Sequence, residues 1–238
     1  MTPSSLLGKL LRSRAFVCAM GAALAMLAAC DDDAPAAVAP APATIPADLR
    51  DTGLFADFDA RVVADDVMSF VPQYPLWSDG ATKRRWIRLP AGAAIDASDP
   101  DAWSFPVGTK LWKEFSFGGK PVETRTMELG ADGRWAFATY VWSADGGSAT
   151  LSATTGGTTV APIVALANGS RHAIPTTSEC TACHDASRPV LGFSALQLSS
   201  DRDPLAPHAE PPSPGSVDLQ DLVAAGRLVG ELARLDQP

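Results

Sequence analysis

Residues 110–142 read KLWKEFSFGGKPVETRTMELGADGRWAFATYVW and carry the clearest indication of the fold. Its β-prone runs, rich in aromatic residues, Thr and Val, cover 110–117, 122–129 and 134–142. Gly118-Gly119 and Asp132-Gly133 separate these runs. A glycine-containing pair between two β-prone runs is the strongest short-range signal for a hairpin. The stretch therefore predicts consecutive antiparallel strands joined by tight turns.

The same pattern continues on both sides of this stretch. Further strands are predicted at 82–89 (TKRRWIRL), 148–153 and 158–166. Glycine-containing pairs punctuate them at Gly146-Gly147, Gly156-Gly157 and Asn168-Gly169. Strands at this spacing are typical of an antiparallel meander that closes as a sandwich or a small barrel. We therefore expect a mainly β fold, followed by a small α-helical segment near the C-terminus.

All six tryptophans lie within or beside these runs: Trp77, Trp86, Trp103, Trp112, Trp135 and Trp142. Large aromatic side chains contribute most to buried cores, so a core between sheets is the main interpretation. The alternative is an aromatic floor for a sugar or for the edge of a cofactor.

The chemistry is concentrated in Cys180-Thr181-Ala182-Cys183-His184. This C-x-x-C-H spacing is the attachment signature of c-type haem, in which two thiols form thioethers with one porphyrin and the histidine binds its iron. Thr176 and Glu179 form a capping-box pattern, which predicts a helix that places both cysteines on one face. The chain resembles the bacterial c-type cytochromes in this motif. The resemblance implies haem c bound by Cys180, Cys183 and His184.

Three other readings of the motif are a thiol redox pair, half of a zinc site and two buried cysteines. A redox pair needs a βαβ setting that the sequence does not predict. A structural zinc site needs four ligands, and only His172, His208 and Cys30 remain as candidates in the exported chain.

The sequence does not decide which side chain is the sixth ligand of the iron. The small cytochromes that this chain resembles usually supply a methionine downstream of the motif, but no methionine follows Met127. The candidates are His172, His208, Met127, Met68 or no side chain at all. We favour His172, which lies just before the predicted haem helix. The carbonyl of Pro189 is expected to orient the His184 ring.

The first 29 residues form a bacterial export signal. Lys9, Arg12 and Arg14 precede an Ala-rich apolar stretch that is short for a membrane span. The stretch ends in Leu27-Ala28-Ala29-Cys30, which resembles a lipobox and implies a lipid on Cys30. Residues 30–47 are an acidic and Ala-Pro tether, 48–170 a β-rich domain and 171–238 the haem-binding segment, with a final helix over 217–235. Export places the protein in the periplasm, anchored to the inner membrane if Asp31 acts as a retention signal.

The formal net charge of −8 argues against nucleic acid as a partner. Arg84, Arg85 and Arg88 are either a solvated strand face or partners for haem propionates. We expect an electron carrier with transient redox protein partners and a membrane contact through Cys30. The alternatives are an enzyme or haem-containing subunit whose β-domain binds a substrate, and a haem-based sensor; the sequence shows no nucleophile set that favours an enzyme.

Overall fold

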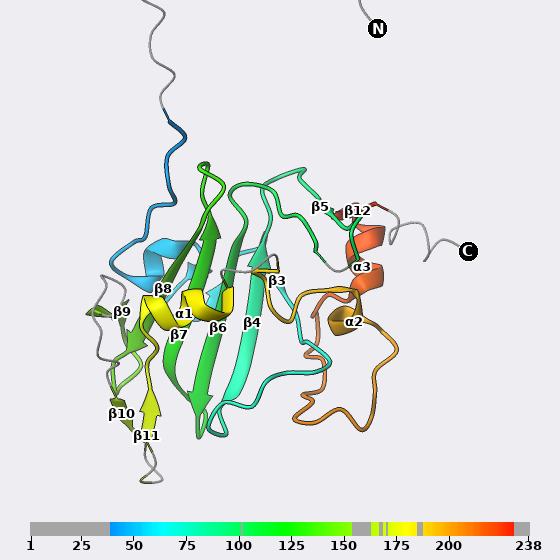
Figure 1. Ribbon diagram of the computed structural model, residues 1–238. Helices are drawn as coiled ribbons and strands as arrows, with labels where there is room; N and C mark the ends of the chain where they lie inside the picture. Colours follow the sequence, from blue (N-terminus) through cyan, green and yellow to red (C-terminus); the bar gives the residue numbers. More distant parts are fainter. Residues whose placement is uncertain are drawn as a thin grey trace, which may run out of the picture. The chain divides into compact units, whose positions relative to one another are not determined.

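The computed structural model describes residues 39–100, 102–153, 163–166, 169, 171–184 and 188–230. A six-stranded antiparallel sheet forms its centre (Figure 1). The strands lie in the order β3 (Met68–Ser69), β4 (Thr82–Arg88), β6 (Lys110–Phe117), β7 (Lys120–Leu129), β8 (Trp135–Trp142) and β9 (Ala149–Leu151). The fold is therefore mainly antiparallel β-sheet with short helices near the C-terminus, as predicted. Strands β6 to β9 are neighbours in both sequence and space, so this part is a meander.

The turn between β6 and β7 shows why the sequence specifies this register. Phe117 pairs with Lys120, which leaves only Gly118 and Gly119 in the turn. Both glycines have positive φ, 57° and 78°. A two-residue turn with this backbone matches the twist of antiparallel strands, and residues with a Cβ rarely adopt it.

Shorter elements surround the sheet. Two further antiparallel pairs are β1 (Phe55–Asp57) with β2 (Val62–Val63) and β10 (Ile163–Ala165) with β11 (Arg171–Ala173). Strand β5 (Ile95–Asp96) pairs in parallel with β12 (Leu228–Val229). The helices are η1 (Leu49–Thr52), α1 (Thr177–His184), α2 (Ala195–Leu198) and α3 (Leu219–Ala224). Within the described ranges, no helix has the length and apolar character needed to cross a bilayer.

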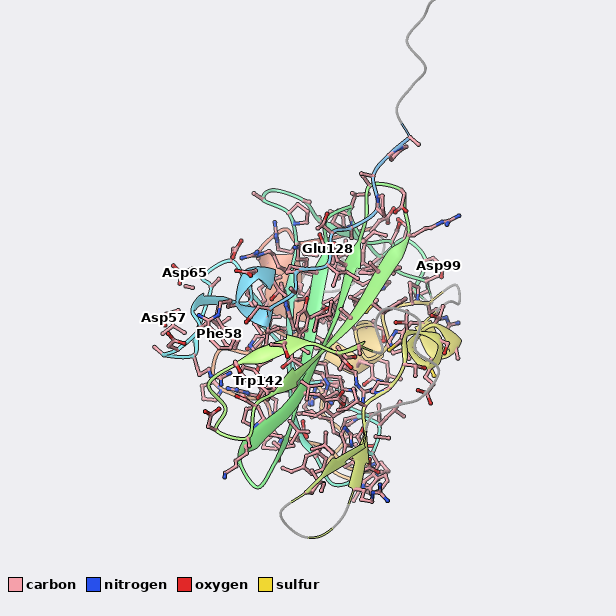
Figure 2. All side chains as sticks on the ribbon, turned by 90° about the vertical axis from the view of Figure 1, so that its left-hand side faces the viewer. Asp57, Phe58, Asp65, Asp99, Glu128 and Trp142 are labelled. Atoms are coloured by element: carbon pink, nitrogen blue, oxygen red, sulfur yellow. The ribbon has the colours of Figure 1, made fainter. Side chains whose placement is uncertain are left out.

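One side of the sheet, here called the tryptophan face, carries Trp86, Trp112 and Trp142. Trp86 and Trp112 are cross-strand neighbours and are 4% and 2% exposed. The N-terminal elements cover this face, and the Phe58 ring stacks on Trp142 at 5.4 Å between centroids (Figure 2). Stacked and buried aromatic rings make this a dense core.

The opposite side, here called the helix face, carries Ile87, Leu111 and Met127 in one cross-strand row. These residues pack with apolar side chains of the C-terminal part: Val190, Phe193, Leu198, Leu222 and Leu228. Figure 2 shows α1 on the other side of the sheet from η1. Four tryptophans are buried as predicted, whereas Trp77 is 61% exposed.

The structure corrects the prediction of a long final helix over 217–235. Helix α3 ends at Ala224, and Gly226 has a φ of 63°. The chain then forms β12, where the backbone N–H of Ala97 donates to the Val229 carbonyl at 2.8 Å. The helix is short because Leu228 and Val229 pair with β5 instead of continuing it. Strand β5 lies more than 120 residues earlier in the chain, so the local sequence carries no signal of this pairing. Residues 231–238 lie outside the described residues.

The boundaries of the folded part also differ from the expected ones. Residues 39–47, expected as tether, lie against the sheet: the Tyr140 hydroxyl donates to the Pro46 carbonyl at 2.9 Å, and the Leu151 N–H to the Ala47 carbonyl at 2.9 Å. Residues on both sides of the expected 170/171 boundary share one core, in which Phe70 contacts Phe193 edge to face. The C-terminal residues from Val190 to Leu228 therefore share a core with the β-sheet.

Candidate functional site

Helix α1 begins at the predicted capping box. The Thr176 N–H donates to Glu179 Oε2 at 2.7 Å, and Thr176 Oγ1 accepts from the Glu179 N–H at 3.3 Å. This reciprocal pair satisfies donors at the start of the helix. The helix then brings Cys180 and Cys183 to one face, with His184 as its last residue. Both cysteines are free thiols, Cys180 partly buried and Cys183 exposed.

His184 is held in a defined orientation. Its Nδ1 lies 2.5 Å from the Pro189 carbonyl, the contact predicted from the sequence. A carbonyl only accepts, so Nδ1 carries the proton and the neutral ring keeps its lone pair on Nε2. Burial is the main cause that lowers the pKa of His184; the hydrogen bond to Pro189 opposes it, and the nearby charges of Lys113 and Arg125 lower the pKa further. The lowered pKa favours the neutral imidazole, which is the form that binds metals.

Cys180, Cys183 and His184 line one wall of a cavity of about 280 Å³ on the helix face. Figure 1 shows α1 in yellow across the sheet, and α1 contacts β8. The opposite wall is the sheet itself, where Leu111, Met127 and Phe137 form an apolar floor. Phe137 contacts His184 with 5.5 Å between the ring centroids.

The rim of this cavity is unusually apolar for a surface. Leu76, Trp77 and Leu191 line it and are 71%, 61% and 48% exposed. Lys83 fixes the loop that carries Leu76, because its Nζ donates to the Leu76 carbonyl at 2.6 Å. Exposed apolar side chains gathered around one cavity are typical of a site that binds an apolar ligand.

A row of three cations lies beside the apolar floor. Arg85, Lys113 and Arg125 are direct cross-strand neighbours on β4, β6 and β7, and all three line the cavity. Burial, and then the charges of Arg85 and Arg125, lower the pKa of Lys113 to about 7. Sequence reasoning proposed Arg85 but missed Lys113 and Arg125. The signal that would have found them is the strand register, which places these three positions on one face.

Arg84 and Arg88 do not belong to this row. Arg84 Nη2 lies 2.8 Å from Glu114 Oε1, and its guanidinium lies over the Trp86 ring on the tryptophan face. Arg88 forms an ion pair with Asp66 at 2.6 Å. Of the three arginines considered from the sequence, only Arg85 faces the cavity.

The structure does not bring His172 to the cavity, where we expected it to serve as the distal ligand. Its Nδ1 lies 2.9 Å from Asp79 Oδ2, and its Nε2 lies 2.8 Å from Glu123 Oε1. Both ring nitrogens therefore have carboxylate partners, which argues against a role as an iron ligand. Of the other candidates, Met127 lines the cavity, whereas Met68 and His208 are not among its lining residues. Cys30 lies outside the described residues.

No family model, no curated protein and no solved structure matches this chain. Its function is therefore argued from the site alone.

Proposed function

We propose that the chain is an exported c-type cytochrome that carries one covalently attached haem and transfers single electrons. The observation that supports this proposal best is the cavity shared by Cys180, Cys183 and His184 with an apolar floor and rim. The motif alone is a pattern of five residues. The cavity adds an apolar surface beside the motif, against which one side of a flat and largely apolar group could lie.

The residues in the cavity fit haem c in their chemistry. The two thiols can form thioethers, and the neutral His184 offers Nε2 to the iron while Pro189 fixes the ring orientation. The bound haem would supply a one-electron redox couple. The protein would exclude water from one side of the ring with Leu111, Met127 and Phe137, and it would leave one edge near the surface at Cys183.

An edge near the surface suits a carrier that meets its partners briefly. The chain's formal charge of −8 would favour redox proteins with a basic docking face, through electrostatic steering. The C-x-x-C-H motif and the export signal support each other, because bacteria attach haem c outside the inner membrane. We therefore place the protein in the periplasm, bound to a membrane by lipid on Cys30 and without a role in nucleic acid binding.

The test is expression of the full chain with and without a c-haem maturation system. We expect haem that remains on the protein in a denaturing gel, an added haem mass, and a thioether-type haemochrome spectrum, all only with the maturation system. Mature protein from such a host without the added mass would contradict the proposal. Binding of CO to the ferrous protein would favour the sensor or enzyme alternative, because it shows an open iron site.

The lipid anchor has its own test. We expect Cys30→Ser to move the protein from the membrane fraction to the soluble periplasmic fraction while its haem content stays unchanged. Unchanged membrane association would contradict the lipobox interpretation and would leave the haem proposal intact.

A further inference from the structure

The row of Arg85, Lys113 and Arg125 is a costly arrangement for the protein without a ligand. Like charges that face each other across strands destabilise a sheet, and Arg85 is only 6% exposed. Two members have carboxylate partners: Arg85 pairs with Glu210 at 3.2 Å and Arg125 with Glu123 at 2.5 Å. Within the described part of the chain, Lys113 forms no ion pair, and its Nζ lies over the Phe115 ring at 4.8 Å.

The position of the row beside the apolar floor indicates the chemical class of ligand that would fit the cavity. The row borders the floor made by Leu111, Met127 and Phe137, and both line the same cavity. A ligand that contacts both the floor and the row needs an apolar body for the floor and, on one side, acidic groups for the three basic side chains. Arginine forks match carboxylates in shape, and an anion bound beside Lys113 would favour the charged form of its amine.

We propose that Arg85, Lys113 and Arg125 form a carboxylate-binding wall that holds the two propionates of the haem. This inference rests on the proposed function, because it assigns the polar side of the same cavity. The thioethers and His184 would fix one side of the ring from α1, and the cation row would hold its acidic groups from the sheet. The sheet would then orient the cofactor as well as cover it.

Comparing the affinities of haemin and its dimethyl ester distinguishes recognition of the propionates from simple apolar binding, because the ester lacks the acidic groups. Each is titrated into the haem-free full chain, made without a maturation system and followed by the haem absorption. Hydrogen bonds between charged groups are stronger than those to a neutral ester, so haemin should bind at least about tenfold more tightly than the ester. Equal affinities would overturn the proposal.

Lys113→Met tests the row itself, and Lys120→Met at an exposed position of β7 is the matched control. We expect Lys113→Met to weaken haemin binding by about tenfold and to leave ester binding unchanged. Because it removes a partly buried charge that lies between two arginines, it should also raise the melting temperature of the haem-free chain. A preference for haemin over its ester that is unchanged in Lys113→Met would exclude Lys113 from the wall and contradict the proposal.

A free dicarboxylate is the other possible source of the acidic groups. Succinate is therefore titrated by calorimetry into the haem-loaded full chain, where the propionates should block the row and no binding is expected. Succinate binding that Lys113→Met abolishes would assign the row to a separate acidic substrate and overturn the proposal.

Lys113→Met, but not Lys120→Met, should also lower the reduction potential of the haem-loaded protein, because a nearby cation stabilises the ferrous state. An unchanged potential would count against the assignment.

These results separate the two proposals. Covalent haem without any preference for haemin over its ester would leave the cytochrome standing and the cation row unassigned. Absence of covalent haem would remove the proposed function whatever the ester titration shows.

Discussion

Replacing both Cys180 and Cys183 with alanine is expected to abolish covalent haem while leaving the fold intact. Each thiol forms one thioether, so the double variant has no bond that survives denaturation. Helix α1 has no buried side chain, and alanine is the best helix former, so the substitutions should cost little stability. Haem staining of a denaturing gel and intact mass measure the loss.

Two controls make this result interpretable. Cys30→Ser removes a cysteine outside the motif and should keep full haem staining. Circular dichroism should show the same β-sheet signal for the double variant as for the wild type. Haem that stays bound through denaturation in the double variant would show that attachment uses other residues, and the central proposal would fall.

The second large effect is expected at His172, and it concerns stability instead of iron binding. Glu123 has no exposed side-chain surface and shares one oxygen, Oε1, with His172 at 2.8 Å and Arg125 at 2.5 Å. Breaking one partner out of a buried ionic pair typically costs about 3–5 kcal/mol. We therefore expect His172→Leu to lower the free energy of unfolding by several kcal/mol, measured by urea denaturation.

Arg171→Ala, at an exposed neighbouring position of β11, is the matched control and should change the stability little. His172→Gln can still donate to one carboxylate and should recover part of the loss. The haem spectrum of His172→Gln should match that of the wild type. A change from low-spin to high-spin haem would instead restore His172 as the distal ligand.

The His172 network also predicts a pH dependence. The hydrogen bond to Glu123 is the main cause that raises the pKa of His172, burial opposes it, and the bond to Asp79 adds to the rise. Protonated His172 therefore stabilises the folded state fully below its unfolded pKa of about 6.5. This stabilisation falls as pH rises through the folded pKa. The difference in stability between wild type and His172→Gln should shrink across that window.

Local signals in the sequence predicted the sheet well. The run predicted at 110–117 is β6 itself, and the neighbouring strands differ by only one or two residues at their ends. Pairs such as Gly118-Gly119 permit the tight two-residue turn that joins neighbouring antiparallel strands, so sequence-local information was sufficient there. The capping box at Thr176 and the contact between Pro189 and His184 were predictable for the same reason, since each lies within a few residues.

Features that depend on distant pairing were not predictable. The parallel pairing of β5 with β12 leaves no periodic pattern in either two-residue strand. Lys113 and Arg125 read as solvated charges in isolation, and only the register of β6 with β7 places them together. His172 was a reasonable candidate ligand by position, but its partner Glu123 lies 49 residues earlier in the chain.

Two parts of the chain form the cavity, and they differ in how firmly they pack against the rest of the protein. The sheet wall comes from strands with extensive backbone pairing, whereas α1 contributes no buried side chain. Opening of weakly packed segments costs far less than global unfolding. If the chain carries haem c as proposed, local opening of α1 would present Cys180 and Cys183 to the enzymes that attach the cofactor while the sheet stays folded. The attached porphyrin would then tether α1 to the sheet and make this local opening rarer in the mature protein.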